Sequence, residues 1–251
     1  MKFYLNPLNL LWRVVNKIAL SSFLITLLCT EQSQAQSFVF GPKLGPSIEF
    51  QIWNGLQRQT LISYHGAFFI ESYDEGEPSS LYAEVGFHKR GSSERQRFIN
   101  NAGNDFIGGR QRFEFNNVNL IAGAKRILNM DKSTKPYYLL AIRVEYTLST
   151  NLEQYEQFAG YFPIEPFVNK INYGFTVGGG FQYDFSELIG GAIEFRLNPD
   201  ISKQYDQPPL ENVINPWDFG NRRSIAQQSI RNLSFEVSAV FRLKRIVEFA
   251  R

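Results

Sequence analysis

The stretch NYGFTVGGGFQYDF, residues 172–185, carries a large apolar side chain at every second position, with small or polar side chains between them and Gly179 as the exception. Successive side chains of a strand point to opposite faces, whereas a helix repeats every 3.6 residues. The stretch therefore predicts a β-strand with one apolar face and one polar face.

The same alternation recurs along the rest of the chain and predicts seven more strands. We expect them at residues 40–52, 60–72, 81–88, 111–127, 138–148, 192–197 and 231–243. Pro42 and Pro46 predict local bulging near the start of the first strand. In the fourth, the apolar positions change parity, which predicts a bulge near Asn116 and Asn117.

The connections between these strands alternate in length. Those after the third, fifth and seventh strands hold roughly twenty residues or more, and those after the second, fourth and sixth hold about four to eight, an asymmetry typical of outer-membrane barrels with long outer loops and short periplasmic turns. The short first outer connection, residues 54–59, departs from this rule. We expect an all-β, eight-stranded antiparallel up-and-down transmembrane β-barrel with both mature termini in the periplasm.

The composition of the two faces indicates which one meets lipid. A soluble lipocalin-like barrel has the same period with its apolar face inward, but its outer face needs many solvated charges. Here the apolar face is aromatic-rich and nearly free of charge, and the polar face mixes opposite charges with small residues such as Gly174, Gly178 and Gly180. This pattern favours lipid outside and a tight polar lumen. Aromatic residues near strand ends, among them Tyr64 and Phe113, are expected to form interfacial girdles.

The first residues are typical of a secretory signal peptide. A basic start leads into the uncharged apolar run Ile18–Leu28, which is too short to span a membrane comfortably. Small residues at Ser33 and Ala35 predict cleavage after Ala35. Residues 1–35 are therefore expected to be a signal peptide and residues 36–251 the barrel domain. A lipoprotein would use Cys29, but Leu28 precedes it where a small residue is expected.

Removal of the leader leaves a chain without cysteine and without net charge. Three of the 26 basic residues and one of the 24 acidic residues lie in the leader, so 23 of each remain. The mature chain thus has no disulfide framework, no thiolate zinc site and no basic excess typical of nucleic-acid binding. No cofactor is indicated.

Charges of both signs lie in the polar rows that are expected to face the lumen. Unpaired buried charge is costly, so we predict a network of ion pairs across the interior. Its expected members are Lys43, Glu49, Glu71, Glu84, Arg143, Glu145, Asp184, Glu194, Arg196, Glu236 and Arg242. Side chains nearly fill an eight-stranded barrel, which favours a structural network. The alternative is a narrow gated ion path, testable by bilayer conductance of the protein and of Arg143→Ala.

The expected outer loops hold the candidates for partner binding, because binding residues concentrate on loops carried by a rigid scaffold. The second outer loop is basic, from Lys89 and Arg90 to Arg110, and the third and fourth are rich in aromatic residues. Basic residues there suit lipopolysaccharide phosphates or an acidic partner. Aromatic residues predict contacts with one another or with a partner. The candidates are Arg95, Arg97, Arg110, Tyr161, Phe162 and Trp217.

Catalysis has few candidate residues. The chain has two histidines, His65 and His88. A membrane-embedded hydrolase of lipid or lipopolysaccharide needs a histidine near a serine and a carboxylate. The one loose match is His88 with Ser92, Ser93 and Glu94, a proximity in sequence only. We therefore expect no enzymatic activity.

Several segments together resemble the outer-membrane β-barrel domain family of Bacteroidetes-type bacteria that is often called PorT-like. They are Phe40–Ile52, Leu81–Phe87, Gly174–Gly180, Ile193–Arg196 and Asn232–Phe235. The resemblance implies a small eight-stranded barrel of the OmpA and OmpX kind. One branch of the family serves a protein-secretion apparatus, which implies an accessory role as an alternative. This chain departs from the pattern by ending in Lys244–Arg251, without a final aromatic residue.

Three functions follow as hypotheses. The first is a non-enzymatic outer-membrane barrel that supports the envelope or binds a partner, such as an envelope or secretion-system protein, through its loops. The second is a membrane-embedded hydrolase, and the third is a soluble ligand-binding barrel. Heat-modifiable migration of membrane fractions on gels separates the first two from the third, and lipid A mass spectra after deletion test the hydrolase.

Overall fold

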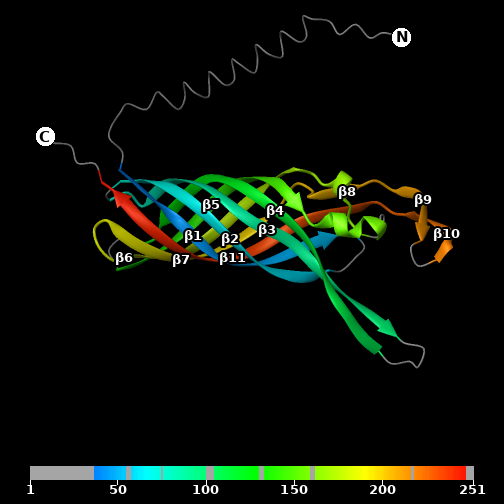
Figure 1. Ribbon diagram of the computed structural model, residues 1–251. Coiled ribbons are helices and arrows are strands. Elements are labelled where there is room, and N and C mark those ends of the chain that lie inside the picture. Colours follow the sequence, from blue (N-terminus) through cyan, green and yellow to red (C-terminus); the bar gives the residue numbers. More distant parts are fainter. Residues whose placement is uncertain are drawn as a thin grey trace, which may run out of the picture. The chain divides into compact units, whose positions relative to one another are not determined.

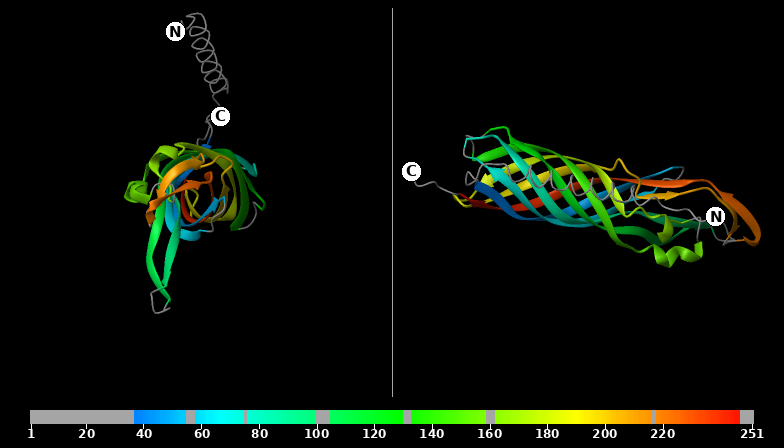
Figure 2. Two further views of the ribbon diagram at one scale, coloured as in Figure 1. Left: turned by 90° about the vertical axis from the view of Figure 1, so that its right-hand side faces the viewer. Right: turned by 90° about the horizontal axis from the view of Figure 1, so that it is seen from above.

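Eight antiparallel strands close into a barrel in the computed structural model (Figure 1). The structure describes residues 37–54, 58–74, 76–99, 105–129, 133–158, 162–215 and 218–246. Seen end-on, the strands form a ring (Figure 2). No helix in these described ranges is long and apolar enough to cross a membrane.

The barrel strands follow one another around the ring in chain order. They are β1 (Ser37–Trp53), β2 (Gln59–Tyr73), β3 (Ser79–Ile99), β4 (Asp105–Ile127), β5 (Thr134–Thr150), β6 (Ile171–Asp184), β7 (Ile189–Pro199) and β11 (Gln228–Arg245). Each pairs with the next, and β11 pairs back with β1. Closure leaves no sheet edge within the barrel, so its backbone N–H and C=O groups bond to one another. The predicted eight-stranded up-and-down fold is confirmed.

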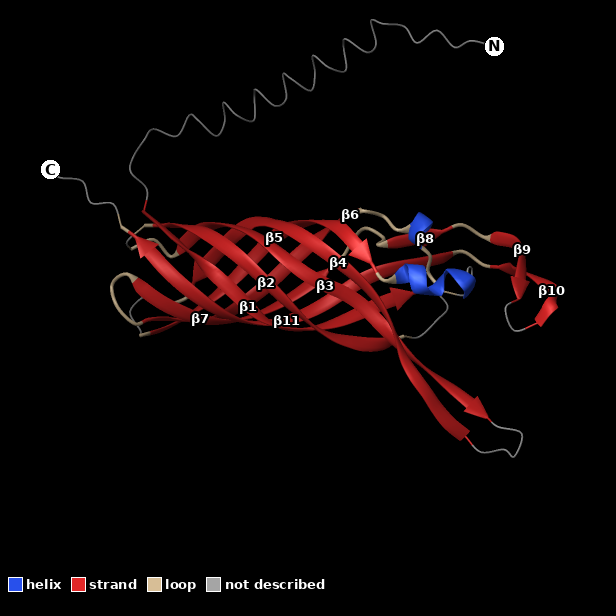
Figure 3. Cartoon of the chain, viewed as in Figure 1, coloured by secondary structure: helices blue, strands red, loops and turns tan. Residues whose placement is uncertain are grey.

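The remaining elements gather at one end of the barrel, opposite the first and last barrel residues (Figure 3). They are the 3₁₀ helices η1 (Leu152–Phe158) and η2 (Glu165–Phe167) and the short strands β8 (Tyr205–Gln207), β9 (Leu210–Asn215) and β10 (Asp218–Ile225). β8 adds to β11, and β9 pairs with β10. We call this the lid end, and the other the termini end.

The expected long loop after the third strand is wrong. β3 and β4 instead continue as a two-stranded ribbon that projects beyond the barrel (Figure 1), paired out to Ile99 and Asp105. The strands on either side end their pairing before the ribbon does. β2 pairs with β3 as far as Ser93, and β5 pairs with β4 as far as Phe115. Residues 89–99 lack the apolar alternation of a lipid-facing strand, so the sequence pattern did not reveal the extension.

The apolar face points outward, as predicted. Phe175, Val177 and Phe181 are 49%, 47% and 46% exposed, whereas Arg143 and Glu145 are 1% exposed. The same alternation of exposed apolar and buried polar side chains runs along β1 and β5. A closed barrel with an apolar exterior and a charged interior is the architecture of a transmembrane β-barrel and is the reverse of a lipocalin.

The two predicted bulges had different outcomes. The register of β4 against β5 shifts between Asn116 and Asn117, which confirms the bulge there. The bulge at Pro42 and Pro46 is wrong, because β1 keeps one register against β2 and against β11. A Cβ atom on Gly45 would lie 1.8 Å from the carbonyl oxygen of Val237, so close approach of β11 requires glycine at this position.

Aromatic side chains pack under the lid end. Phe113 and Phe115 on β4 form a cluster with Tyr155 and Leu152 of η1 and with Phe162, and all five are buried. The prediction that Phe113 belongs to a lipid-facing girdle is therefore wrong, because its side chain points into the barrel. Tyr64, by contrast, is exposed on the apolar face as expected.

Candidate functional site: the charged lumen

The lumen side chains form tiers along the barrel axis, because inward positions recur at every second residue of each strand. Glycine residues on the inner face leave room for the long side chains of lysine and arginine. A Cβ atom on Gly178 would lie 2.9 Å from Cγ of Arg196, so the glycine row of β6 accommodates the arginine that crosses the lumen from β7.

The tier nearest the termini end is built on Glu71 of β2. Its carboxylate oxygens lie 2.8 Å from Nζ of Lys125 on β4 and 2.7 Å from Nη2 of Arg242 on β11. At the barrel mouth, Asp184 lies 2.9 Å from the ammonium of Lys135 and 2.8 Å from that of Lys244. Asp184 is half-buried, so it closes the end of the network rather than lying within it.

A four-charge ring follows. Glu84 lies 2.7 Å from Lys43 and 2.9 Å from Arg196. Glu194 completes the ring at 3.1 Å from Lys43 and 2.7 Å from Arg196. The hydroxyl of Tyr137 donates a 2.9 Å hydrogen bond to Glu194, and that of Tyr82 donates to Glu84. Two carboxylates and two cations from β1, β3 and β7 thus neutralise one another.

Two histidines lie in the central tier. The rings of His65 and His88 stack with centroids 5.6 Å apart and an interplanar angle of 13°. His88 Nδ1 lies 2.7 Å from a carboxylate oxygen of Glu236, and its Nε2 lies 2.5 Å from the side-chain amide of Asn119. His65 Nε2 lies 2.8 Å from the hydroxyl of Ser238. Both rings are thereby held between β2, β3, β4 and β11.

Arg90 occupies the next tier and crosses the lumen. Its side chain is fully buried. It donates to Glu145 of β5 at 2.5 Å and to Glu49 of β1 at 3.2 Å, and it also donates to the hydroxyl of Ser234 on β11. One guanidinium from β3 therefore forms hydrogen bonds with side chains of β1, β5 and β11.

Arg143 extends this tier toward the lid end. Its Nε lies 2.7 Å from Glu145, and another of its nitrogens pairs with Asp200, which follows β7. A net of amides lies beyond: Asn232 donates to Asp200 at 2.9 Å and to Gln204 at 3.1 Å. Charged pairs thus give way to neutral hydrogen bonds toward the lid.

Arg58 and aromatic rings cap the lumen. The Arg58 guanidinium lies 4.2 Å from the Trp53 ring centre and 5.0 Å from that of Phe113, and it pairs with Glu94. Tyr205 of β8 is fully buried and donates a 2.7 Å hydrogen bond to Gln207. Burial raises the pKa of the Tyr205 phenol to about 12, which keeps it a hydrogen-bond donor.

The structure brings ten of the eleven predicted network residues into the buried lumen and leaves Asp184 at its mouth. Sequence reasoning missed Arg90, for which the sequence predicts a place in an outer loop, and also Lys125 and Asp200. Arg90 has the same parity as Glu84 and His88, so extending the third strand by two residues would have placed it inside. Asp200 lies just beyond the last alternating residue of β7 and had no such signal.

The described loop candidates do not form one site, because Arg95 and Arg110 are paired in register on β3 and β4 whereas Phe162 is buried under the lid. Arg95 is exposed on the ribbon, and Arg110 donates to Ser93 and to the carbonyl of Thr60. Arg97 lies in β3, and its side chain is outside the described part. Tyr161 and Trp217 also lie outside the described residues. The prediction that Phe162 binds a partner is wrong, because its ring is 4% exposed and packs against Phe113. Phe162 supports the lid and offers no surface to a partner.

The four loosely matched catalytic residues do not converge. His88 contacts Asn119 and Glu236, whereas the Ser92 hydroxyl donates to Gln51 at 2.6 Å. Ser93 bonds to Arg110 and Glu94 pairs with Arg58. No group of three or more His, Cys, Asp or Glu side chains suited to a metal ion occurs in the described ranges.

Paired charges in a buried interior hold fixed positions. Removing one partner of a buried pair typically costs about 3–5 kcal/mol, because the other charge stays desolvated. The arrangement suits a rigid, filled barrel whose strands are cross-linked through their side chains.

Comparisons with known proteins found similarity only at the level of structure. No protein-family profile and no curated protein sequence matches the chain. Neisserial surface protein A is 12% identical, with a TM-score of 0.49 over 83% of this chain and 97% of that one. The outer membrane protein OprG from Pseudomonas aeruginosa is 9% identical, with a TM-score of 0.49 over 85% and 97%. A third structure is that of Ail, the attachment invasion locus protein of Yersinia pestis, in complex with the heparin analogue sucrose octasulfate. It is 10% identical, with a TM-score of 0.40 over 82% of this chain and 99% of that one.

Proposed function

We propose that this protein is a non-enzymatic barrel of the bacterial outer membrane whose lumen is closed to solutes and which acts through the structures at its lid end. The arrangement around Arg90 carries the proposal. Its guanidinium is fully buried and bonds to residues of β1, β5 and β11. A side chain fixed in this way obstructs the lumen and stiffens the wall at once.

The outer-membrane location is supported by the architecture. Antiparallel barrels with an apolar outer band, short turns at one end and longer structures at the other are typical of the bacterial outer membrane. In that orientation the termini end faces the periplasm, and the ribbon, η1 and the β9–β10 hairpin face outward. The predicted signal peptide, residues 1–35, fits this export route.

Bilayer conductance tests closure of the lumen. The mature protein, shown to be folded by its heat-modifiable migration, is reconstituted in planar bilayers. We expect no channel events, because ion pairs and the aromatic cap fill the lumen. Steady ohmic conductance from the folded protein would overturn the proposal and favour the ion path. Arg143→Ala is the sensitised variant, since it removes one side chain from the obstructing tier.

Partner binding at the lid end is tested by photo-cross-linking in intact cells. A cross-linker replaces Arg95 on the ribbon or Arg222 on β10, both of which are exposed. The control replaces Val177, which faces lipid. We expect protein adducts from the two lid-end positions and none from Val177, and identical adduct patterns from all three would contradict the proposal. Assignment to the PorT-like family and an accessory role in secretion remain predictions.

A further inference from the structure

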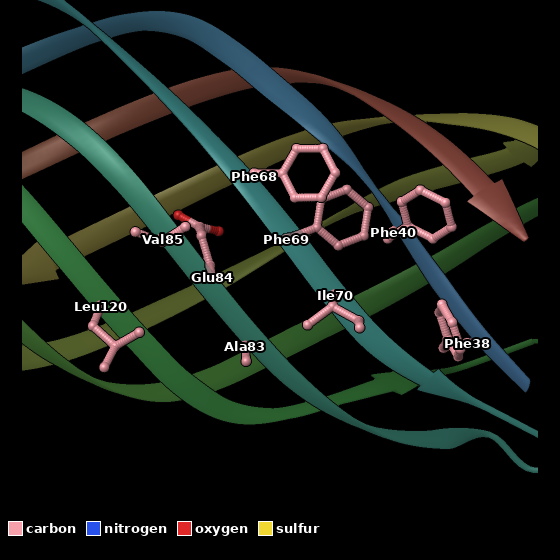
Figure 4. A pocket seen from close by; sticks show the side chains of 9 residues that line it. All are labelled: Phe38, Phe40, Phe68, Phe69, Ile70, Ala83, Glu84, Val85 and Leu120. Carbon is pink, nitrogen blue, oxygen red and sulfur yellow. The ribbon is translucent and has the colours of Figure 1, made fainter. Parts of the chain in front are cut away.

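Two hollows interrupt the lipid-facing surface near the termini end. The first has a volume of about 480 Å³ and is lined by side chains that include Phe38, Phe40, Phe68 and Leu120 (Figure 4). Ala83 of β3 is one of its lining residues, and its methyl group stands where the neighbouring outward position, Val85, carries a larger side chain. The lining is almost wholly apolar.

The second hollow lies against the other side of β1. It has a volume of about 530 Å³, and its lining includes Phe40, Ile189, Leu243 and Arg245. Phe40 lines both hollows, and its ring centre lies 5.9 Å from that of Phe38. These two rings form a ridge between the hollows.

Arg245 lies at this ridge. It is paired in register with Phe38, and its guanidinium carbon lies 5.6 Å from the Phe38 ring centre. Its neighbour Lys244 is already bound to Asp184 at 2.8 Å. Arg245 has no carboxylate ion pair within the described part of the chain, and its side chain is exposed. A cation without an ion pair among the described residues therefore lines the second hollow and contacts Phe38, which lines the first.

We propose that this is a binding site for one acidic diacyl glycerophospholipid, with its phosphate on Arg245 and its two acyl chains in the hollows on either side of the Phe38–Phe40 ridge. A guanidinium binds phosphate through two parallel hydrogen bonds. The volumes of the two hollows are in the range of ligand pockets. An acyl chain that fills a hollow packs against its apolar lining. Aromatic rings at headgroup level are typical of membrane interfaces.

The site differs from the general lipid coat, because one cation, one aromatic ridge and two hollows together match a two-chain lipid. The choice of a phospholipid rests on the orientation in the proposed function, in which the termini end meets the periplasmic leaflet. Lipid A, from the opposite leaflet, is the competing ligand.

Native mass spectrometry of the folded mature protein in detergent micelles tests the site. The probes are phosphatidylglycerol and phosphatidylethanolamine of equal chain length, and lipid A. We expect one phosphatidylglycerol to be retained in preference to the other two. Arg245→Gln should weaken phosphatidylglycerol binding at least about tenfold, since a tenfold change corresponds to about 1.4 kcal/mol and a hydrogen bond to a charged group contributes at least that much. The matched control is Arg231→Gln, an exposed arginine at the other end of the same strand, and it should bind as the wild type does.

Ala83→Leu probes the acyl-chain part of the site. The added side chain fills the first hollow from the lipid-facing surface, so the barrel should fold and all three probes should be retained less. Equal binding by Arg245→Gln and Arg231→Gln, unchanged binding by Ala83→Leu, or preference for lipid A would each overturn the proposal. Bilayer conductance tests the closed lumen and does not depend on lipid binding. The proposed function and the phospholipid site can therefore be refuted separately.

Discussion

Arg90 shows how one buried side chain can organise a barrel interior. It is fully buried, and Glu49 and Glu145 bind it from two other strands. It neutralises two carboxylates that are buried in the lumen. A buried pair need not stabilise more than an apolar pair would, but losing one partner is severe.

We predict that Arg90→Met lowers the free energy of unfolding by about 3–5 kcal/mol, because Glu49 stays buried without its cation and Glu145 keeps only Arg143. Arg95→Met, an exposed arginine on the same strand, should change it by less than about 0.5 kcal/mol. Urea titration in detergent, followed by heat-modifiable gel migration, measures both. Similar losses in the two variants would contradict the assigned role of Arg90.

Tyr205 gives a pH prediction outside the membrane-spanning part. Burial raises its pKa to about 12 from an ordinary value of 10.0, so the folded lid favours the protonated phenol. Its contribution to lid stability is complete below pH 10 and is lost as the pH rises toward 12. The difference between the ultraviolet titrations of the wild type and of Tyr205→Phe should contain one tyrosine that ionises near pH 12. An unchanged titration curve in Tyr205→Phe would count against it.

At the scale of elements, the barrel strands were predictable and the lid was not. Lipid on one side and a polar lumen on the other impose a strict period of two, so the strands through Val144 and Val177 stand out in the sequence. Beyond the membrane no such boundary exists. Residues 89–99, which run from the lumen tier of Arg90 into the ribbon, therefore carry no alternating apolar row, and their sequence predicts a loop. The burial of Phe162 depends on Phe113 and Tyr155, which are distant in sequence.

The seam between β1 and β11 closes the barrel, and glycine at position 45 permits it. We predict that Gly45→Val prevents folding, because a Cβ atom there would lie 1.8 Å from the carbonyl oxygen of Val237. Gly109→Val is the control, since nothing lies within 4 Å of its added Cβ atom. Folding into lipid vesicles, read by heat-modifiable migration, compares them. Equal folding yields would show that the seam tolerates a side chain.

At the scale of the whole molecule, the placement of charge and apolar surface is inverted relative to a soluble protein. Glu84, Glu194 and Arg196 lie in the centre, while Leu140, Val177 and Ile193 lie outside. The hydrophobic effect stabilises this arrangement only if the exterior is removed from water. The fold, the closed lumen and the proposed phospholipid site all depend on that condition.

Fluorescence quenching of a label at position 177 tests this most directly. Cys29 is the one cysteine of the chain, so Val177→Cys in a Cys29→Ala background carries one label. In vesicles we predict strong quenching by brominated lipid and almost none by aqueous iodide. Strong quenching by iodide and none by brominated lipid would place the apolar face of β6 in water and contradict the structure.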